Sequence, residues 1–152
     1  MEHREKVFEI LNESCGNCKD NIVALSTISA REDGSILPFV REVDALYEDG
    51  IFYITTWAKS NKMRQIEKNY NVAFSVNLEG ITGHGIAENL GWVLEADNAN
   101  IRTKLREAFS NWYDEANNEK DENCIILSVK IRQCEIVKDH GAIRYSLNLD
   151  EA

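Results

Sequence analysis

Hydroxyl and lysine side chains converge on one short stretch of the sequence. Thr55 and Thr56 end an aromatic, apolar run of residues. Ser60, Asn61 and Lys62 then open a predicted helix, whose N-terminus offers unpaired backbone N–H groups and a partial positive charge. Together these groups suit a phosphate monoester. A capped helix with a solvated lysine has the same spacing, so the motif alone leaves both interpretations open.

The cysteines are the second group that could do chemistry. Cys15 and Cys18 have the C-x-x-C spacing, whereas Cys124 and Cys134 lie on one predicted strand. A structural zinc site needs a second close pair or histidines at ligand spacing, and the three histidines are scattered, so we expect no metal. A helix precedes the C-x-x-C motif, unlike the thioredoxin arrangement. A turn between a helix and a strand is favoured, with metal or redox chemistry as the alternative.

The elements around these residues predict a mainly β domain of the α+β class. Strands are expected at 21–29, 36–43, 51–57, 72–78, 81–90, 124–137 and 142–149. Helices are expected at 4–13, 61–68 and 97–116. Turn signals at Asp33-Gly34 and at 48–50 join the first three strands as hairpins. Seven antiparallel strands of this length tend to close into a small barrel.

Two further segments carry specific expectations. Pro38 lies inside a predicted strand and cannot donate to the ladder, so it marks an edge, a bulge or a backbone held open for a ligand. Apolar residues at a 3.6-residue spacing predict that 97–116 is one continuous helix. We expect its basic residues, 102 to 106, to form a solvated face, and the acidic run 114–122 to be a solvated loop.

Composition excludes several classes of partner. The 152 residues include 17 basic and 26 acidic side chains, which gives a net charge of −9. Such a surface repels phosphate backbones and anionic lipids, so nucleic acid and membrane are not expected partners. No apolar run approaches the roughly 20 residues of a membrane span. The charged N-terminal segment is unlike a secretory signal, so we expect a cytoplasmic protein with reduced thiols.

The order of several weak motifs makes a more specific match. They are Gly34 at the first hairpin, the threonine-ending strand 51–55, Ser60 to Lys62, the strand start 69–72, and Gly-Ile-Ala-Glu at 85–88. This run, from about residue 21 to 90, resembles the pyridoxamine 5′-phosphate oxidase-like family of FMN-binding split barrels. The resemblance implies an antiparallel split β-barrel with flanking helices, formed as a single domain over residues 1–152.

The resemblance also implies a cofactor site. It predicts a homodimer with two FMN sites at the interface and a small-molecule substrate. Nine positions would contact FMN: Pro38, Phe39, Val40, Ile54, Thr55, Thr56, Ser60, Asn61 and Lys62. Residues 60–62 would hold the phosphate, 54–56 would follow the ribityl chain and the ring edge, and 38–40 would line the isoalloxazine ring.

The chain departs from the family pattern at three places. Many family members carry a phosphate-binding arginine near the position of Phe39, and the nearest arginine here is Arg41, whose alternation phase favours the same face. The glutamine from the partner subunit would fall near Gly80. The chain ends in RYSLNLDEA and lacks the Arg-Leu-x-Pro-like tail that grips pyridoxamine phosphate. We therefore expect an FMN-dependent oxidoreductase with a substrate other than pyridoxamine phosphate.

Other functions remain open on the same scaffold. One is a non-catalytic flavin-binding or stress-sensing module. Another binds haem, with His84 or His140 as the axial ligand, or a deazaflavin, which also carries phosphate. Trp57, beside the phosphate motif, stacks on a flavin or packs in the interface, whereas Trp92 and Trp112 are expected to pack.

Overall fold

The computed structural model describes residues 2–150 and confirms an antiparallel, mainly β architecture. The strands are β1 (Asn21–Ala30), β2 (Ile36–Glu48), β3 (Ile51–Trp57), β4 (Asn71–Val76), β5 (Ile81–Trp92), β6 (Cys124–Lys138) and β7 (Ile143–Asn148). The helices are α1 (Glu2–Cys15), α2 (Asn61–Lys68), α3 (Ala99–Ala108) and α4 (Tyr113–Ala116), with 3₁₀ turns η1 (Ala96–Asn98) and η2 (Asp139–Gly141).

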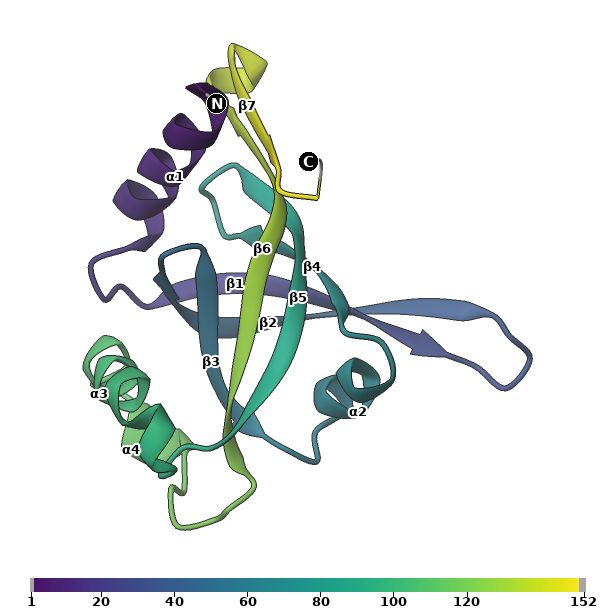
Figure 1. Ribbon diagram of the computed structural model, residues 1–152, viewed down its shortest axis with the longest axis vertical. Helices are drawn as coiled ribbons and strands as arrows, with labels where there is room; N and C mark the ends of the chain where they lie inside the picture. Colours follow the sequence, from purple (N-terminus) through teal and green to yellow (C-terminus); the bar gives the residue numbers. More distant parts are fainter. Residues whose placement is uncertain (1, 151–152) are drawn as a thin grey trace.

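Six of the strands close into a barrel. The sheet runs in the order β3-β2-β1-β4-β5-β6-β7, and pairing between β3 and β6 closes the first six strands. Strand β7 extends the sheet beyond β6 and packs beside α1 at one end of the molecule (Figure 1). Helix α2 and the α3–α4 pair flank other parts of the barrel. The predicted split barrel with flanking helices is therefore confirmed.

Alternating apolar side chains fill the barrel. Phe52 on β3 is 1% exposed, and its ring lies 5.4 Å from that of Tyr47 and 5.2 Å from that of Phe74, measured between centroids. A second cluster lies where α3 and α4 cover β2 and β6, and it includes Leu46, Leu105, Phe109, Tyr113 and Ile126. The two clusters hold β3 and β6 from both faces, so the ends of these strands have fixed positions.

The β1–β2 hairpin reaches well beyond the barrel (Figure 1). The two strands pair along the whole of β1, from Asn21 opposite Ala45 to Ala30 opposite Ile36. Strand β3 pairs with β2 only at 46–48, so the outer half of β2 has a free edge. Pro38 lies on this edge opposite Ile28, which agrees with the edge position expected of a proline within a strand.

The predicted helix over 97–116 is wrong as one element. The structure has η1, then α3, and then a separate turn, α4, after a break at residues 109–112. Phe109 and Trp112 stack across this break, with ring centroids 4.7 Å apart and planes inclined by 23°. Trp112 also donates from Nε1 to Asp20 Oδ2 at 3.0 Å, so contacts with a distant segment override the local helical pattern.

The C-x-x-C segment forms the expected turn between α1 and β1. Asn17 and Cys18 adopt positive φ angles of 60° and 57°, which reverse the chain direction. All four cysteines are free thiols, and burial raises the pKa of Cys15 to about 11. Such a thiol is protonated at neutral pH and is a poor nucleophile.

Within residues 2–150, none of the helices combines the length and the apolar character that crossing a membrane requires.

Candidate functional site

The lysine and the hydroxyl groups singled out in the sequence meet at the end of β3. Lys62 Nζ lies 2.6 Å from Thr56 Oγ1 and 3.5 Å from Ser60 Oγ. Ser60 is the N-cap of α2, but its side chain makes no capping hydrogen bond, so its hydroxyl group faces the lysine instead. Asn61 begins the helix and is exposed. The predicted grouping of residues 60–62 with the strand end is therefore present.

Arg41 adds a second cation to this corner. Its guanidinium donates to Thr27 Oγ1 at 2.6 Å and to Gln65 Oε1 at 3.0 Å, which fixes it between β1 and α2. Burial and the nearby Arg41 charge both lower the pKa of Lys62. Within the described chain, neither Arg41 nor Lys62 has a carboxylate partner, although the protein carries 26 acidic residues. We call Arg41, Thr56, Ser60 and Lys62 the cationic corner.

The first turn of α2 adds backbone donors to the cationic corner. The first intrahelical bond runs from Arg64 N–H to Ser60 O at 3.1 Å. The three preceding N–H groups of the helix therefore have no acceptor within α2. With the hydroxyl groups and the two cations, they form a set of donors that suits a phosphate group.

A cavity of about 470 Å³ opens beside the cationic corner. Its lining includes Ile54, Thr55, Thr56, Trp57 and Lys62, which all come from the segment that the sequence singled out. Ile54 is 3% exposed, and Thr55 Oγ1 is buried without a hydrogen-bond partner in the described chain. Trp57 is 51% exposed, so its indole ring forms part of the cavity wall and is not buried in the core.

The sequence did not point to the remaining walls of the cavity. They come from Val43 and Asp44 on β2, from Trp112 and Ala116 near α4, from Asn117, Asn118 and Asp121 in the following loop, and from Cys124. Trp112 was expected only to pack. Asp44 lies one residue beyond the predicted end of its strand at Val43, and no local pattern indicated that its side chain lines a cavity.

Asp44 has an unusual environment. Its carboxyl group lies close to that of Asp20, and neither has an ion-pair partner in the described chain. Partial burial and the neighbouring Asp20 raise the pKa of Asp44 to about 6. The Asp44 carboxyl group therefore takes up a proton in mildly acidic solution more readily than an ordinary aspartate does.

This carboxyl pair predicts a pH-dependent stability. A raised pKa means that the folded protein binds more protons than the unfolded chain between pH about 4 and about 6, so stability falls as the pH rises through this range. Asp44→Asn should raise the stability at pH 7.5 by about 1 kcal/mol after allowance for solvent screening, with little gain at pH 4. Thermal unfolding at both pH values measures this. Glu42→Gln, on an exposed position of the same strand, should change neither value, and an equal Asp44→Asn effect at both pH values would contradict the assignment.

Pro38, Phe39 and Val40 do not line this cavity. They lie on the outer half of β2, where all three are exposed; Phe39 and Val40 are 42% and 70% exposed. Only a neighbouring part of β2, at 43–44, reaches the cavity of the same chain. Of the nine predicted positions, the structure groups 54–56 with 60–62 and leaves 38–40 on the projecting hairpin.

His84 lies elsewhere. It is exposed on β5 and lines a different hollow of about 610 Å³ between β4, β5, β6 and β7. His140 lies in η2 with a positive φ of 56°. Neither histidine is among the described residues that line the cavity beside Lys62.

The comparisons with known proteins identify the fold. No family model matches the chain, and no curated protein matches it. Among solved structures, a candidate pyridoxamine 5′-phosphate oxidase from Listeria innocua superposes with a TM-score of 0.62 at 14% identity, over 89% of this chain and 98% of the other. The chain therefore has the pyridoxamine 5′-phosphate oxidase-like split-barrel fold.

Other split barrels of similar shape carry different names. A FAD-binding protein from Mesorhizobium loti has a TM-score of 0.61 at 15% identity, over 86% of this chain and 89% of the other. A haem-binding protein from Mycobacterium smegmatis has a TM-score of 0.67 at 11% identity, over 93% of this chain and 58% of the other. Proteins with this fold therefore bind different cofactors, and the fold alone does not specify one.

Proposed function

We propose that the protein is an FMN-binding flavoprotein that acts as an oxidoreductase on a small molecule. The cationic corner carries this proposal. It places two half-buried cations with no carboxylate partner, in the described chain, beside two hydroxyl groups and the start of α2. Such an arrangement is costly without an anion, because each cation loses hydration and repels the other.

The residues present fit the phosphate of FMN. A phosphate monoester carries between −1.5 and −2 charges at neutral pH, roughly the sum that Arg41 and Lys62 supply. Thr56 and Ser60 contribute hydroxyl donors. The adjoining cavity of about 470 Å³ falls in the roughly 300–1,000 Å³ range of small-molecule sites, and Trp57 and Trp112 give it flat apolar walls.

The bound cofactor and the protein side chains would have different roles in the reaction. FMN, when bound, supplies hydride transfer. Lys62 and Arg41 would neutralise the phosphate and fix the position of the cofactor. Thr55 also lines the cavity. Trp57 and Trp112 would exclude water from part of it. The substrate that we propose is not pyridoxamine phosphate.

We also propose that the protein is a cytoplasmic homodimer with the flavin sites at the interface. The projecting hairpin supports this arrangement, because it exposes Ile36, Phe39 and Val40 on one strand. In a dimer, residues 38–40 of one chain could approach a cavity of its partner. Size-exclusion chromatography with light scattering should then give about twice the 17.3 kDa mass of the chain, and a monomeric mass would contradict the proposal.

The absorption spectrum of the purified protein tests the cofactor. Oxidised FMN should give two visible bands, and heat should release it as free flavin. Apoprotein should take up added FMN with a 1:1 stoichiometry per chain. A deazaflavin would absorb at a shorter wavelength, and a haem would give a Soret band; either result would overturn FMN as the cofactor. A protein that neither contains nor binds FMN would also overturn it.

Turnover separates an enzyme from a sensor. With FMN bound, we expect NADH or NADPH to reduce the flavin under anaerobic conditions. Bound FMN that neither nucleotide reduces would favour the non-catalytic flavin-binding or stress-sensing module. Haem ligation by a histidine has less support, because both candidate histidines lie away from the cationic corner.

A further inference from the structure

The loop between α4 and β6 forms one wall of the cavity. Asn117, Asn118 and Asp121 all line it, and Trp112 precedes them just before α4. From its composition, this acidic segment was expected to be solvated. Most of its residues are exposed, as expected, but Asn117, Glu119 and Asp121 are partly buried and hydrogen-bonded. What holds them determines the shape of the cavity.

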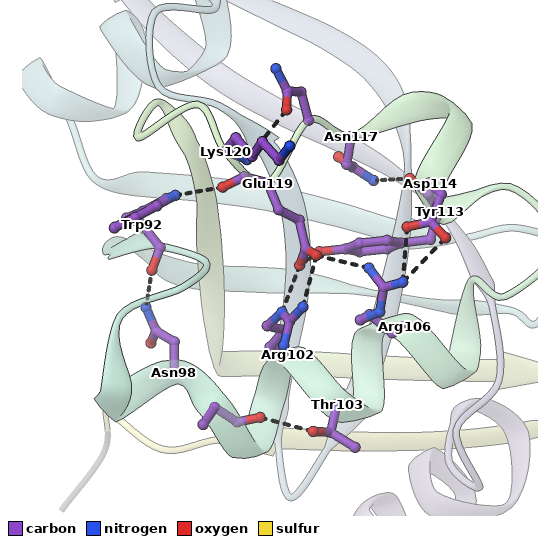
Figure 2. A network of polar contacts seen from close by, with 12 residues as sticks. Trp92, Asn98, Arg102, Thr103, Arg106, Tyr113, Asp114, Asn117, Glu119 and Lys120 are labelled. Carbon is purple, nitrogen blue, oxygen red and sulfur yellow. Dashed lines mark hydrogen bonds and ion pairs between the residues drawn. The ribbon is translucent and has the colours of Figure 1, made fainter.

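Glu119 ties this loop to α3 and to Tyr113 (Figure 2). Its carboxylate accepts hydrogen bonds from Arg102 Nε and Nη2 at 2.7 and 2.8 Å, from Arg106 Nη1 at 2.9 Å and from the Tyr113 hydroxyl at 3.1 Å. Its backbone carbonyl accepts from Trp92 Nε1 at 2.8 Å. The side chain is 15% exposed, and the hydrogen bonds from Arg102 hold the pKa of Glu119 below its ordinary value. Arg102 and Arg106 are thus partly exposed, as expected of this helix face, but they also pair with a carboxylate that the prediction did not include.

The anchored side chains present acceptor atoms. The amide N–H₂ of Asn117 donates to the backbone carbonyl of Tyr113 at 3.0 Å, which leaves its Oδ1 free. Asp121 Oδ1 accepts from the Asn123 N–H at 2.9 Å, which leaves its Oδ2 free. Asp44 adds its carboxyl group to the same lining. We call Asp44, Asn117 and Asp121 the acceptor wall.

The charged groups of the cavity lining also favour a substrate that donates hydrogen bonds. Lys62 is the only cation among the described residues that line it, and the phosphate proposed above would use that charge. The rest of the lining has two carboxyl groups, amides and the indoles of Trp57 and Trp112. A second anion here would meet these acceptor atoms and no further cation among the described lining residues, whereas a nitrogen donor would satisfy the acceptor atoms.

We propose that the acceptor wall binds a substrate whose nitrogen atoms donate hydrogen bonds. The substrate is an amine or an amidine, cationic or neutral, and not an anion. Glu119 is the positioning residue of this wall. The proposal rests on the proposed function in that it takes this cavity as the site of the reaction. Aromatic examples of that class would also contact the two indole rings.

Two probes of matched shape and opposite charge test the substrate class. Amide resonances of the ¹⁵N-labelled protein, with whatever flavin it retains, are followed during titration with benzamidine hydrochloride and with sodium benzoate. We expect benzamidinium to shift residues 117–121 and 44 and to bind at least tenfold more tightly than benzoate. Asp121→Asn should reduce that preference severalfold. Equal binding of the two probes, or shifts confined to other surfaces, would overturn the proposal.

Glu119→Gln tests the positioning role. It removes the charge that Arg102 and Arg106 share, so we expect hydrogen exchange at 117–121 to accelerate and benzamidinium to bind about tenfold more weakly. Glu48→Gln is the matched control, because Glu48 pairs with Lys104 on the same helix but does not line this cavity; it should leave both measurements unchanged. A Glu119→Gln protein with unaltered exchange and probe affinity would refute the positioning role.

Flavin content is read separately, from the visible spectrum of the same samples. Benzamidinium binding at 117–121 in a protein that takes up no FMN would overturn the flavin proposal but not the acceptor-wall proposal. A flavin-loaded protein that binds benzamidinium and benzoate equally would overturn the acceptor-wall proposal but not the flavin proposal.

Discussion

Lys62→Glu should abolish FMN retention while the protein remains folded. The substitution places a carboxylate beside Thr56 and Ser60, where the phosphate of FMN is proposed to bind, and leaves Arg41 to pair with it. Losing one charge-assisted contact and adding a repulsive one is expected to weaken binding by at least about 100-fold, roughly 3 kcal/mol. Titration of apoprotein with FMN, followed by flavin fluorescence, measures the change.

Lys59→Glu is the matched control for this prediction. Lys59 is exposed and lies three residues before Lys62, in the turn that precedes α2, and its replacement changes the net charge by the same amount. Its affinity for FMN should fall less than threefold, because an exposed charge is screened by salt. If both variants lose FMN equally, the effect comes from the overall charge of the protein and not from the cationic corner. If neither does, Lys62 is not a phosphate ligand.

Elements with a strong local signal were predicted well from the sequence. The Asp-Gly turns at Gly34 and Gly50 have positive φ angles of 85° and 83°, the conformation that glycine permits and that reverses a strand pair. Alternation of apolar residues placed the strands within a few positions. The most frequent error concerned the lengths of the strands. Strand β2 continues to Glu48, five residues beyond its predicted end, because residues of its inner half pack both in the barrel core and in the α3–α4 cluster.

The site was predictable only where its residues are close in sequence. Thr56, Ser60 and Lys62 lie within seven positions, so their meeting follows from one strand and one helix start. Asp20 and Trp112 are 92 positions apart, and nothing local to either indicates the contact between them. The same holds for Glu119 and Arg102, which a local pattern assigns to a loop and to a solvated helix face.

Phe52→Ala should strongly destabilise the fold. Phe52 is 1% exposed and contacts the rings of Tyr47 and Phe74 inside the barrel. Removing the ring leaves a cavity that neighbouring strands, each hydrogen-bonded on both sides, cannot close. We expect a loss of about 3–5 kcal/mol in the free energy of unfolding, a large part of the 5–15 kcal/mol typical of a domain. Urea unfolding followed by tryptophan fluorescence measures the change.

Phe39→Ala separates stability from function. Phe39 has the same side chain but is 42% exposed on the projecting hairpin, so its removal should change the free energy of unfolding by less than about 0.5 kcal/mol. If the hairpin of one chain covers a flavin bound in its partner, the same variant should nevertheless weaken FMN binding severalfold. Unchanged stability with unchanged FMN affinity would remove residues 38–40 from the site. A loss of stability comparable to that of Phe52→Ala would show that the hairpin is part of the folding core, which its exposure and free edge argue against.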